Sequence, residues 1–269
     1  EAKEGYEPFD DLLSEEILDW YAPADSDRFT KTVHQVIPRD DQKGLVVIDA
    51  SELADVIVLS DAVYTIGREK TTERLGEDGT LPEMDEDGSQ AQVFTFAMTD
   101  AESPDPENEL KTPFDNFDSY YQEQVNNFYS FGSFSWERIW TYRRLKNTGD
   151  PYSFDSVHRG DVSMQNWFPG NDYPYGNIYK NKANAEAETS DWKGGVILPD
   201  LADMEKHAVG WYFYMKENRP TDWDTKYPHG DHPDNMMDTG WGLSKFPYIR
   251  GTRRIIGLHN FRLLGRYFV

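Results

Sequence analysis

The residues best suited to chemistry lie in one short stretch near the end of the chain, Lys245–Gly257, which reads KFPYIRGTRRIIG. It places Arg250, Arg253 and Arg254 within five positions of one another, among aromatic and branched apolar side chains. The planar guanidinium of arginine matches the geometry of carboxylates and other oxyanions. In a chain with a formal net charge of -22, such a cluster is either a structural clamp for carboxylates or a site for an anionic ligand.

A run rich in histidine and aspartate, Tyr227–Asp238, is another candidate for chemistry. Imidazole and carboxylate groups together are a plausible metal set. No second ligand segment is identifiable, so we expect a capped loop and predict no metal site. Catalytic motifs are missing: the sequence contains no G-x-G-x-x-G, no Walker A motif, no H-E-x-x-H and no G-x-S-x-G. The residues alone therefore indicate an α+β module with an arginine-rich candidate pocket.

Composition narrows the class of protein. The 269 residues suffice for one large domain or two small ones, and the 14% aromatic content is typical of a folded chain. The 49 acidic against 27 basic residues argue against a general nucleic-acid binder, which needs a basic surface. The chain has no cysteine, which excludes disulfides and thiol nucleophiles and leaves the compartment open. No apolar run approaches the roughly 20 residues that span a membrane, so we expect a soluble protein, with the periplasm or secretion as possible locations.

The elements that must position these residues are predicted from the hydrophobic pattern. In the first hundred residues we expect a helix at Asp10–Trp20 and a strand at Ala91–Met98. Between them we expect a hairpin of two strands, Thr30–Ile37 and the buried Leu45–Ile48. Further along, we expect helices at Asp118–Phe128 and Leu198–Asn218. Asp161–Tyr179 is predicted as an ordered irregular loop and Ile255–Val269 as strand-like. Core or pocket wall is expected for Trp136, Ile139, Trp140 and Tyr142, and a packed rather than catalytic role for His207.

Four segments together resemble the FAD-dependent oxidoreductases of bacteria whose members carry a D-A-T-E-L-G-D or D-A-T-G-D-G-D motif and a Y-I-R-E-S-R-R-I motif. They occur in the order found in that family and extend from about Val47 to Gly257. The similar segments are 47–55 (VIDASELAD) followed by 63–69 (VYTIGRE), 90–98 (QAQVFTFAM), 140–144 (WTYRR) with 166–173 (NWFPGNDY), and 248–257 (YIRGTRRIIG).

The chain departs from the family pattern in informative ways. Ser51 stands where the family has Thr, Ala54 where it has Gly, and Gly251-Thr252 where it has Glu-Ser. Family members also begin with a Rossmann-type strand and glycine fingerprint that cradles the FAD pyrophosphate, and they end with another FAD-contacting segment. Neither is present here. The resemblance therefore implies the middle of such an enzyme, with FAD held mainly by a companion polypeptide that carries the fingerprint, in a nicked precursor or a hetero-oligomer.

This resemblance implies an α+β fold in which a substrate domain with a mixed or antiparallel sheet and flanking helices joins part of an α/β FAD-binding domain. Residues 1–70 would form an acidic N-terminal helix and the remnant of cofactor-domain strands, and residues 71–269 the substrate or cap domain. Cofactor contacts are predicted at Asp49, Ala50, Ser51, Glu52 and Arg254. Substrate contacts are predicted at Asn166, Trp167, Asn171, Asp172 and Tyr173.

The predicted catalytic residues are His158, Arg250 and Arg253. His158 would act as a general base, although no partner for it is visible. Arginine has too high a pKa to be a base, so its roles would be to orient a carboxylate or to stabilise negative charge on reduced flavin. We predict the substrate side of an oxidoreductase that passes hydride from a small organic substrate to flavin. The alternatives are a non-catalytic structural or ligand-binding subunit on the same scaffold, and an unrelated carbohydrate-binding or hydrolytic domain.

Overall fold

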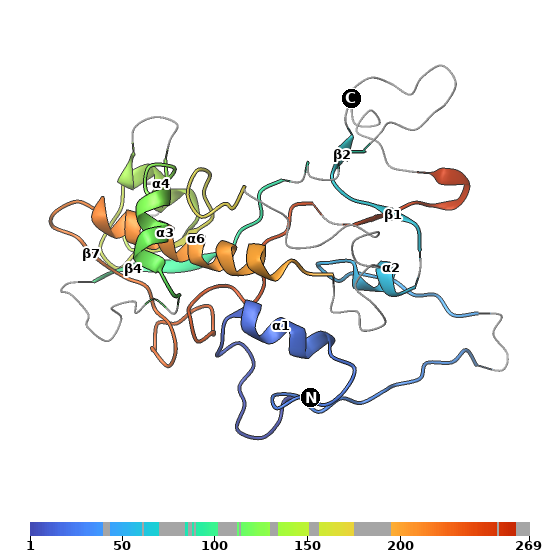
Figure 1. Ribbon diagram of the computed structural model, residues 1–269. Helices are drawn as coiled ribbons and strands as arrows, with labels where there is room; N and C mark the ends of the chain where they lie inside the picture. The colour runs from blue at the N-terminus through green and yellow to red at the C-terminus, as the bar shows by residue number, and fades with distance from the viewer. Residues whose placement is uncertain are drawn as a thin grey trace, which may run out of the picture.

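The computed structural model describes residues 1–39, 44–60, 62–69, 84–85, 88, 90–101, 112, 114–129, 134–150, 156–174, 195–251 and 253–261. Its helices are α1 (Leu13–Tyr21), α2 (Asp55–Leu59), α3 (Phe117–Gln124), α4 (Trp136–Tyr142) and α6 (Leu198–Glu217), with a 3-10 turn η2 (Leu258–Asn260). Its strands are β1 (Tyr64–Thr65), β2 (Arg68–Glu69), β3 (Met84–Asp85), β4 (Phe96–Ala101), β5 (Arg144–Lys146), β6 (Val162–Gln165), β7 (Asp224–Lys226) and β8 (Arg254–Ile255). Helices with small antiparallel sheets confirm the predicted α+β class (Figure 1).

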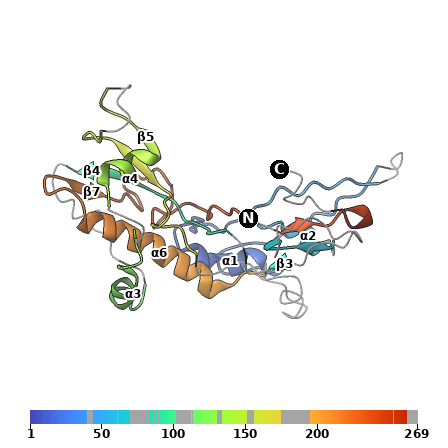
Figure 2. The same cartoon turned by 90° about the horizontal axis from the view of Figure 1, so that it is seen from above.

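A four-stranded antiparallel sheet of order β5-β6-β4-β7 forms the centre of the fold. Strand β4 pairs with β6 on one side, with Phe96 opposite Gln165, and with β7 on the other. Five of the six β4 side chains are buried, because the strand is central and covered on both faces. The long helix α6 runs alongside this sheet in both views (Figure 2).

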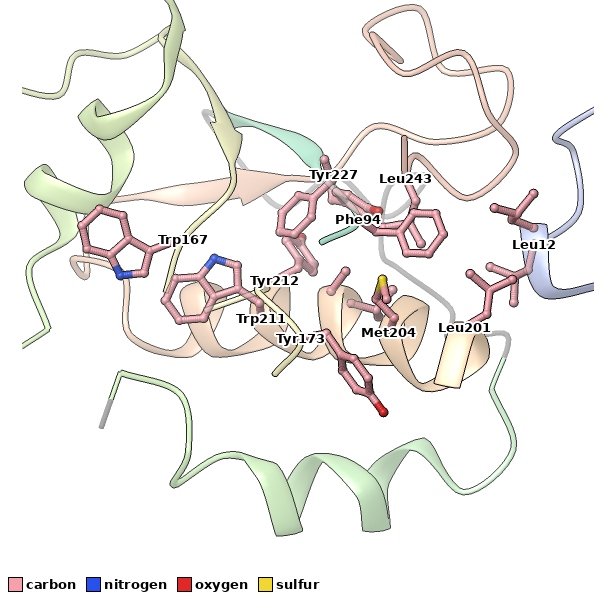
Figure 3. Close-up of a cluster of buried hydrophobic side chains, with 14 of the residues drawn as sticks. Leu12, Phe94, Trp167, Tyr173, Leu201, Met204, Trp211, Tyr212, Tyr227 and Leu243 are labelled. Carbon is pink, nitrogen blue, oxygen red and sulfur yellow. The ribbon is translucent and has the colours of Figure 1, made fainter. Parts of the chain in front are cut away.

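Helix α6 fulfils the sequence prediction almost residue for residue. Pro199 occupies its first turn and Asp200 lies near the positive end of its dipole. Its predicted apolar stripe is buried, because side chains three and four positions apart share one helix face. Figure 3 shows this stripe facing Phe94, Tyr227 and Leu243. The stripe consists of Leu201, Met204, Ala208, Trp211, Tyr212 and Met215.

On helix α4, three of the four predicted core residues are buried and one is not. Trp136, Ile139 and Trp140 are buried, and the two tryptophan rings lie 4.9 Å apart. Tyr142, however, is 54% exposed. It lies two positions beyond Trp140, and residues two apart on a helix do not share a face. The aromatic density of this region is therefore divided between the core and an outer surface.

The N-terminal helix α1 is bound to α6 through a buried carboxylate. Glu205 of α6 accepts hydrogen bonds from the Ser14 amide at 3.2 Å and the Ser14 hydroxyl at 2.6 Å. It thereby satisfies donors at the start of α1 that no residue of that helix can satisfy. The predicted helix exists, but it begins at Leu13 rather than Asp10 because the chain before it turns back, with the Phe9 amide donating to Glu16 Oε1.

The predicted hairpin of Thr30–Ile37 and Leu45–Ile48 is wrong. Neither segment is a strand, and Leu45–Ile48 is exposed rather than buried. The backbone of both is extended, but a strand also needs a hydrogen-bonded neighbour, and none lies within the part of the chain that the structure describes. We call residues 31–39 and 44–48 the arm. Figures 1 and 2 show it projecting away from α6 and the four-stranded sheet.

Three other boundaries differ from the prediction. The strand expected at Ala91–Met98 begins later, as β4, and the region expected to be irregular from Asp161 contains β6 at its start. The expected strand at the end of the chain is limited to β8 followed by η2, and residues 262–269 lie outside the described residues. The helix expected at Asp118–Phe128 is confirmed as α3. No helix within the described ranges is long and apolar enough to cross a bilayer.

Short antiparallel pairings bring the segments that carry the family resemblance together. Strand β1 pairs with β8, with Tyr64 opposite Ile255. Val93 bridges to Tyr248, and Gln92 bridges to Tyr173. Segments as far apart in sequence as residues 64 and 255 are therefore neighbours, and the candidate site lies where they meet.

Candidate functional site

Arg250 forms the centre of the first candidate cluster. Its Nη1 donates to the Ala91 carbonyl at 2.6 Å and lies 3.0 Å from Asp172 Oδ2. Its Nη2 donates to Asn166 Oδ1 at 2.9 Å and to Asp172 Oδ1 at 3.0 Å. The structure thus unites Arg250 with two predicted substrate residues. We call Arg250, Asn166 and Asp172 the Arg250 cluster.

The Arg250 cluster has the geometry of a clamp. The two Nη atoms approach the two Asp172 oxygens in the bidentate arrangement that arginine favours. Burial raises the pKa of the Asp172 carboxyl, although the Arg250 guanidinium favours the charged form. Each Nη already has two protein partners, so an incoming carboxylate would have to displace Asp172. This geometry supports a structural clamp for a carboxylate of the protein rather than a site for an anionic ligand.

Asn171 and His207 fix the loop between Asn166 and Tyr173 from inside. Asn171 Nδ2 donates to the carbonyls of Phe94 and Gln165, and its Oδ1 accepts from the Trp167 amide at 3.1 Å. His207 Nε2 lies 2.9 Å from the Gly170 carbonyl, and burial lowers the His207 pKa to about 4, so the ring is neutral at physiological pH. The packed role predicted for His207 is confirmed.

Gly170 allows this loop to lie directly on α6. A Cβ at this position would come within 2.7 Å of the Trp211 indole, which real Cβ atoms do not do. Figure 3 shows Trp167 and Tyr173, at the two ends of the loop, on either side of Trp211. The predicted substrate residues therefore lie on one rigid segment held by sheet, helix and arginine.

The fully buried Arg253 forms the centre of a second cluster. Its side chain is 0% exposed; Nη1 donates to the Leu53 carbonyl at 2.7 Å and lies 3.9 Å from Asp55 Oδ1. Tyr21 donates to Asp55, with 3.1 Å to each carboxylate oxygen. Burial raises the Asp55 pKa, although Tyr21 and Arg253 favour the charged form. Arg253 thus links α1, α2 and β8 and has no access to a ligand in this conformation.

Arg254 is exposed and donates to the Gly67 carbonyl at 2.6 Å. Each arginine of the stretch therefore reaches the carbonyl of a different segment: Ala91, Leu53 or Gly67. Because the three segments are distant in sequence, the arginines bind them into one unit. Arg254 alone keeps its side chain at the surface.

The predicted cofactor residues around Asp49 form the turn that precedes helix α2 and bind amides of its first turn. Asp49 accepts from the amides of Ser51 and Ile57, and Ser51 Oγ accepts from the Asp55 amide. Burial acts to raise the pKa of Asp49, but these hydrogen bonds outweigh it and lower that pKa. The amides that would attract an anionic pyrophosphate are already bound by a carboxylate. This turn therefore does not fit the pyrophosphate of FAD; Ala50, Ser51 and Glu52 are exposed and offer side contacts only.

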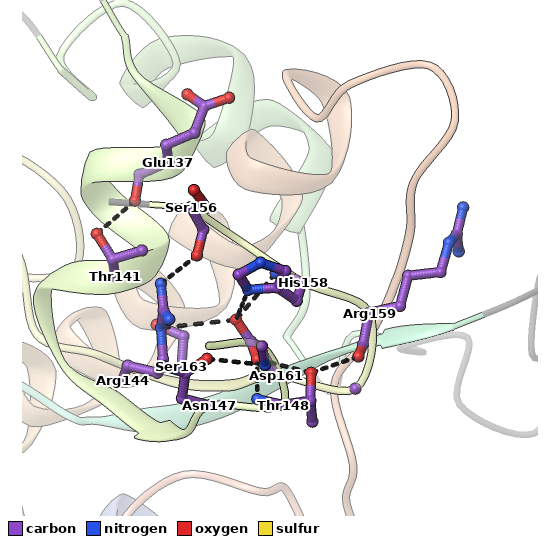
Figure 4. A network of polar contacts seen from close by, with 12 residues as sticks. Glu137, Thr141, Arg144, Asn147, Thr148, Ser156, His158, Arg159, Asp161 and Ser163 are labelled. Atoms are coloured by element: carbon purple, nitrogen blue, oxygen red, sulfur yellow. Dashed lines mark hydrogen bonds and ion pairs between the residues drawn. The ribbon is translucent and has the colours of Figure 1, made fainter. Parts of the chain in front are cut away.

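His158 lies away from the Arg250 cluster. It precedes β6, whereas Asn166 follows β6, and four strand residues separate the two ends by about 10 Å. Figure 4 shows its neighbour Asp161, a 0% exposed carboxylate that accepts from the Thr148 and His158 amides. Asp161 Oδ2 lies 4.0 Å from His158 Nδ1, which is too long for a hydrogen bond. Asp161 therefore organises a loop, and His158 is not grouped with the other predicted catalytic residues.

Beside the Arg250 cluster, the predicted residues Trp167 and Tyr142 lie on an aromatic and cationic face whose two arginines were not singled out from the sequence. Arg138 lies over the Trp167 ring at 5.6 Å and Arg143 over Tyr142 at 5.2 Å. Both arginines are exposed, as is Phe168. The signal that could have found this face is the spacing on α4, which directs Arg138 and Tyr142 to the same side. We call Arg138, Tyr142, Arg143, Trp167 and Phe168 the Trp167 face.

The histidine and aspartate run contains a structured loop. The Asp234 amide donates to His232 Nδ1 at 3.0 Å, and Lys226 bonds the Asp234 carboxylate at 2.5 Å. Across the described ranges, no group of three or more histidine or acidic side chains is placed to hold a metal ion.

The fold and the clusters together define an α+β protein whose arginine stretch fixes a loop carrying amide, carboxylate and aromatic side chains. The family model of FAD dependent oxidoreductases matches residues 9–263. The chain therefore belongs to the FAD dependent oxidoreductase family, and its cofactor is FAD. No curated protein and no solved structure matches the chain.

Proposed function

We propose that this chain is the substrate-side part of an FAD-dependent oxidoreductase that takes hydride from a small organic substrate. Bound flavin supplies the hydride acceptor. The observation that carries the proposal is the loop from Asn166 to Tyr173, held on one side by Arg250 and on the other by Asn171. Such double support keeps substrate-contacting side chains in one geometry, which is the main contribution of a protein to cofactor chemistry.

The substrate in this proposal carries an anionic group. Arg250 is occupied by Asp172, whereas Arg138 and Arg143 present exposed guanidinium groups above aromatic rings. A planar cation on an aromatic surface binds carboxylates while apolar parts of the ligand contact the rings. Trp167 would join this Trp167 face to the Arg250 cluster, since it directly follows Asn166.

Arg250 and Arg253 act as positioning residues in this proposal, since their guanidinium groups bind protein atoms. Arg254, at the surface, would face the flavin and stabilise negative charge on it. His158 keeps its proposed role as a base only if substrate reaches the far end of β6. Residues 1–70 would adjoin the cofactor-binding part, and residues 71–269 would form the substrate domain.

A companion polypeptide holds the FAD pyrophosphate in this proposal. The 269 residues contain no G-x-G-x-x-G fingerprint, and the amides at the start of α2 are bound by Asp49 and Ser51. Such a partner would supply the glycine-rich turn and helix N-terminus that the pyrophosphate requires.

A second candidate function is a non-catalytic structural subunit on the same scaffold. The observation that favours it is that all three arginines of the stretch donate to backbone carbonyls. Membership of the FAD dependent oxidoreductase family sets aside the alternative of an unrelated carbohydrate-binding or hydrolytic domain.

The experiment that separates these functions uses the native assembly. Small carboxylates are screened for bleaching of the flavin absorbance, and the best substrate is then tested on Arg138→Met and its matched control Arg159→Met. Arg159 is also exposed and lies over a tryptophan, Trp223, at 5.5 Å, but it precedes β6, whereas Trp167 follows that strand. We expect KM to rise at least about tenfold for the first variant, equivalent to the loss of about 1.4 kcal/mol of binding, and to stay unchanged for the control. Stoichiometric flavin that no substrate bleaches would favour the structural subunit.

A further inference from the structure

Two arginines of the Trp167 face have no partner for their charge within the part of the chain that the structure describes. Outside the arm, every other described arginine donates its guanidinium group to an oxygen of the protein. Arg138 and Arg143 do not, although the chain has 49 acidic residues. A guanidinium group is always charged and is built to bind oxyanions. Two that stay free on one face indicate that the ligand supplies the anions.

The contrast is sharpest between two neighbours in the sequence. Figure 4 shows Arg144 turned toward Ser156 and Asp161. Its Nη2 donates to the Ser156 carbonyl at 2.6 Å, and its Nε lies 3.6 Å from Asp161 Oδ2. Arg143, one position earlier, is exposed and lies over the Tyr142 ring instead. One of two consecutive arginines thus serves the fold, and the other is left for a ligand.

Aromatic rings form a row between the two free guanidinium groups. Arg138 lies over the Trp167 ring at 5.6 Å, and the Trp167 and Tyr142 rings are 4.7 Å apart at 84°. Arg143 lies over the Tyr142 ring at 5.2 Å. Tyr142 is 54% exposed and Phe168 is 53% exposed, so apolar surface beside the cations is open to a ligand.

The positions of the two arginines favour a ligand with two anionic groups. They are five positions apart in the sequence, which corresponds to about 7 Å along a helix axis. One carboxylate satisfies the fork of one guanidinium group, and the second cation then stays unpaired. A ligand with two carboxylates satisfies both. Its second contact is made within one bound molecule and therefore costs little additional entropy.

We propose that the substrate is a dicarboxylate whose two carboxylates bind Arg138 and Arg143 and whose apolar middle lies against Tyr142 and Phe168. This inference rests on the proposed function and narrows its substrate class from anions to dianions. Arg143 is then the residue that distinguishes a dicarboxylate from a monocarboxylate.

The test uses linear α,ω-dicarboxylates of increasing length, from adipate to dodecanedioate, and the monomethyl ester of each. The two members of a pair share one apolar chain and differ by one negative charge. Binding to the native assembly is measured by calorimetry, which does not depend on turnover. If a diacid bridges both arginines, its advantage over the ester peaks at the length that spans them. Apolar contact alone strengthens with every added CH2 in diacid and ester alike.

Three variants complete the measurement: Arg138→Met, Arg143→Met and the matched control Arg159→Met. Arg159 also lies over a tryptophan ring, at 5.5 Å, but it already donates to the Asp222 carbonyl. We expect the best diacid to bind at least about tenfold more tightly than its ester, and either of the first two variants to remove that advantage. The ester can bind at either arginine, so each variant should weaken it by at most about twofold. The control should change neither affinity.

Equal affinities of diacid and ester at every length, or an advantage that survives Arg143→Met, would overturn the dicarboxylate. The proposed function would stand, because it needs one anionic group and is tested by the KM of Arg138→Met. Binding of polyglutamate that depends on Arg143, without an advantage for any diacid, would also overturn the dicarboxylate and assign the face to an acidic protein. Stoichiometric flavin that no carboxylate bleaches would overturn both proposals, since a bound diacid would then be a ligand and not a substrate.

Discussion

The clamp between Arg250 and Asp172 yields a quantitative prediction about stability. Arg250→Met keeps the length of the side chain but removes every guanidinium donor, leaving the Asp172 carboxylate, 8% exposed, without its cation. Breaking a buried ion pair at one partner costs about 3–5 kcal/mol. Because the Arg250 side chain is 21% exposed, water can replace part of the interaction, and we expect about 3 kcal/mol.

The double variant provides the decisive comparison. Arg250→Met with Asp172→Asn removes both charges, so the penalty for an unpaired buried carboxylate disappears. We expect the double variant to be at least about 1.5 kcal/mol more stable than the sum of the two single variants predicts. Arg254→Met is the matched control: Arg254 is exposed and donates to the Gly67 carbonyl, so its loss should cost under about 1 kcal/mol.

The assay is urea unfolding at pH 7, with the free energy of unfolding obtained from the midpoint and slope. The raised pKa of Asp172 adds a signature. Once Arg250 is removed, the carboxyl relieves its burial by taking up a proton, so the cost of Arg250→Met should shrink as pH falls. The reasoning is refuted if Arg250→Met costs no more than Arg254→Met, or if the effects of the two single variants are additive.

Two further predictions concern pH and backbone strain. Burial raises the pKa of Glu205 to about 7, so its contribution to stability is full below its ordinary pKa and is lost as pH rises through 7. The free energy of unfolding, measured by urea midpoints, should therefore fall between about pH 4.5 and 8, and in Glu205→Gln this fall should be smaller by up to about 3 kcal/mol. Glu123→Gln, at an exposed position, is the control, and an identical pH profile for the two variants would contradict this prediction. Ala54 has a left-handed φ of 54° where the similar family motif has Gly, so Ala54→Gly should change stability by less than about 0.5 kcal/mol, because the relief of strain offsets the lost methyl and chain entropy. The control Ala202→Gly, inside α6, should lower the free energy of unfolding by about 1 kcal/mol in the same urea assay. Equal losses of unfolding free energy at positions 54 and 202 would show that the backbone at Ala54 is not strained.

Sequence patterns predicted α1, α3 and α6 because a helix is determined locally, but they did not predict α2 or α4. The stripe on α6 fixes both the element and its buried face, whatever it packs against. The arm shows the limit of the same reasoning. Leu45–Ile48 has the composition of a buried strand, but a strand exists only with a neighbour, and the sequence does not say whether that neighbour belongs to the same chain.

The candidate site was predicted in its members but not in its connections. Arg250, Asn166 and Asp172 were each singled out, yet the bond between Arg250 and Asp172 joins residues 78 positions apart and depends on the Val93 to Tyr248 bridge. The exposed Arg138 on α4 and Arg143 directly after it were overlooked because an aromatic run suggests a core. Charge and spacing show which side chains can do chemistry, whereas packing decides which of them face a ligand.

An absorbance spectrum of the native assembly, combined with mass analysis of each chain in it, tests the central claim most directly. The account predicts a flavin spectrum in an assembly that pairs this chain with a polypeptide bearing the glycine fingerprint. A colourless assembly, or flavin bound in stoichiometric amount by this chain alone, would contradict it.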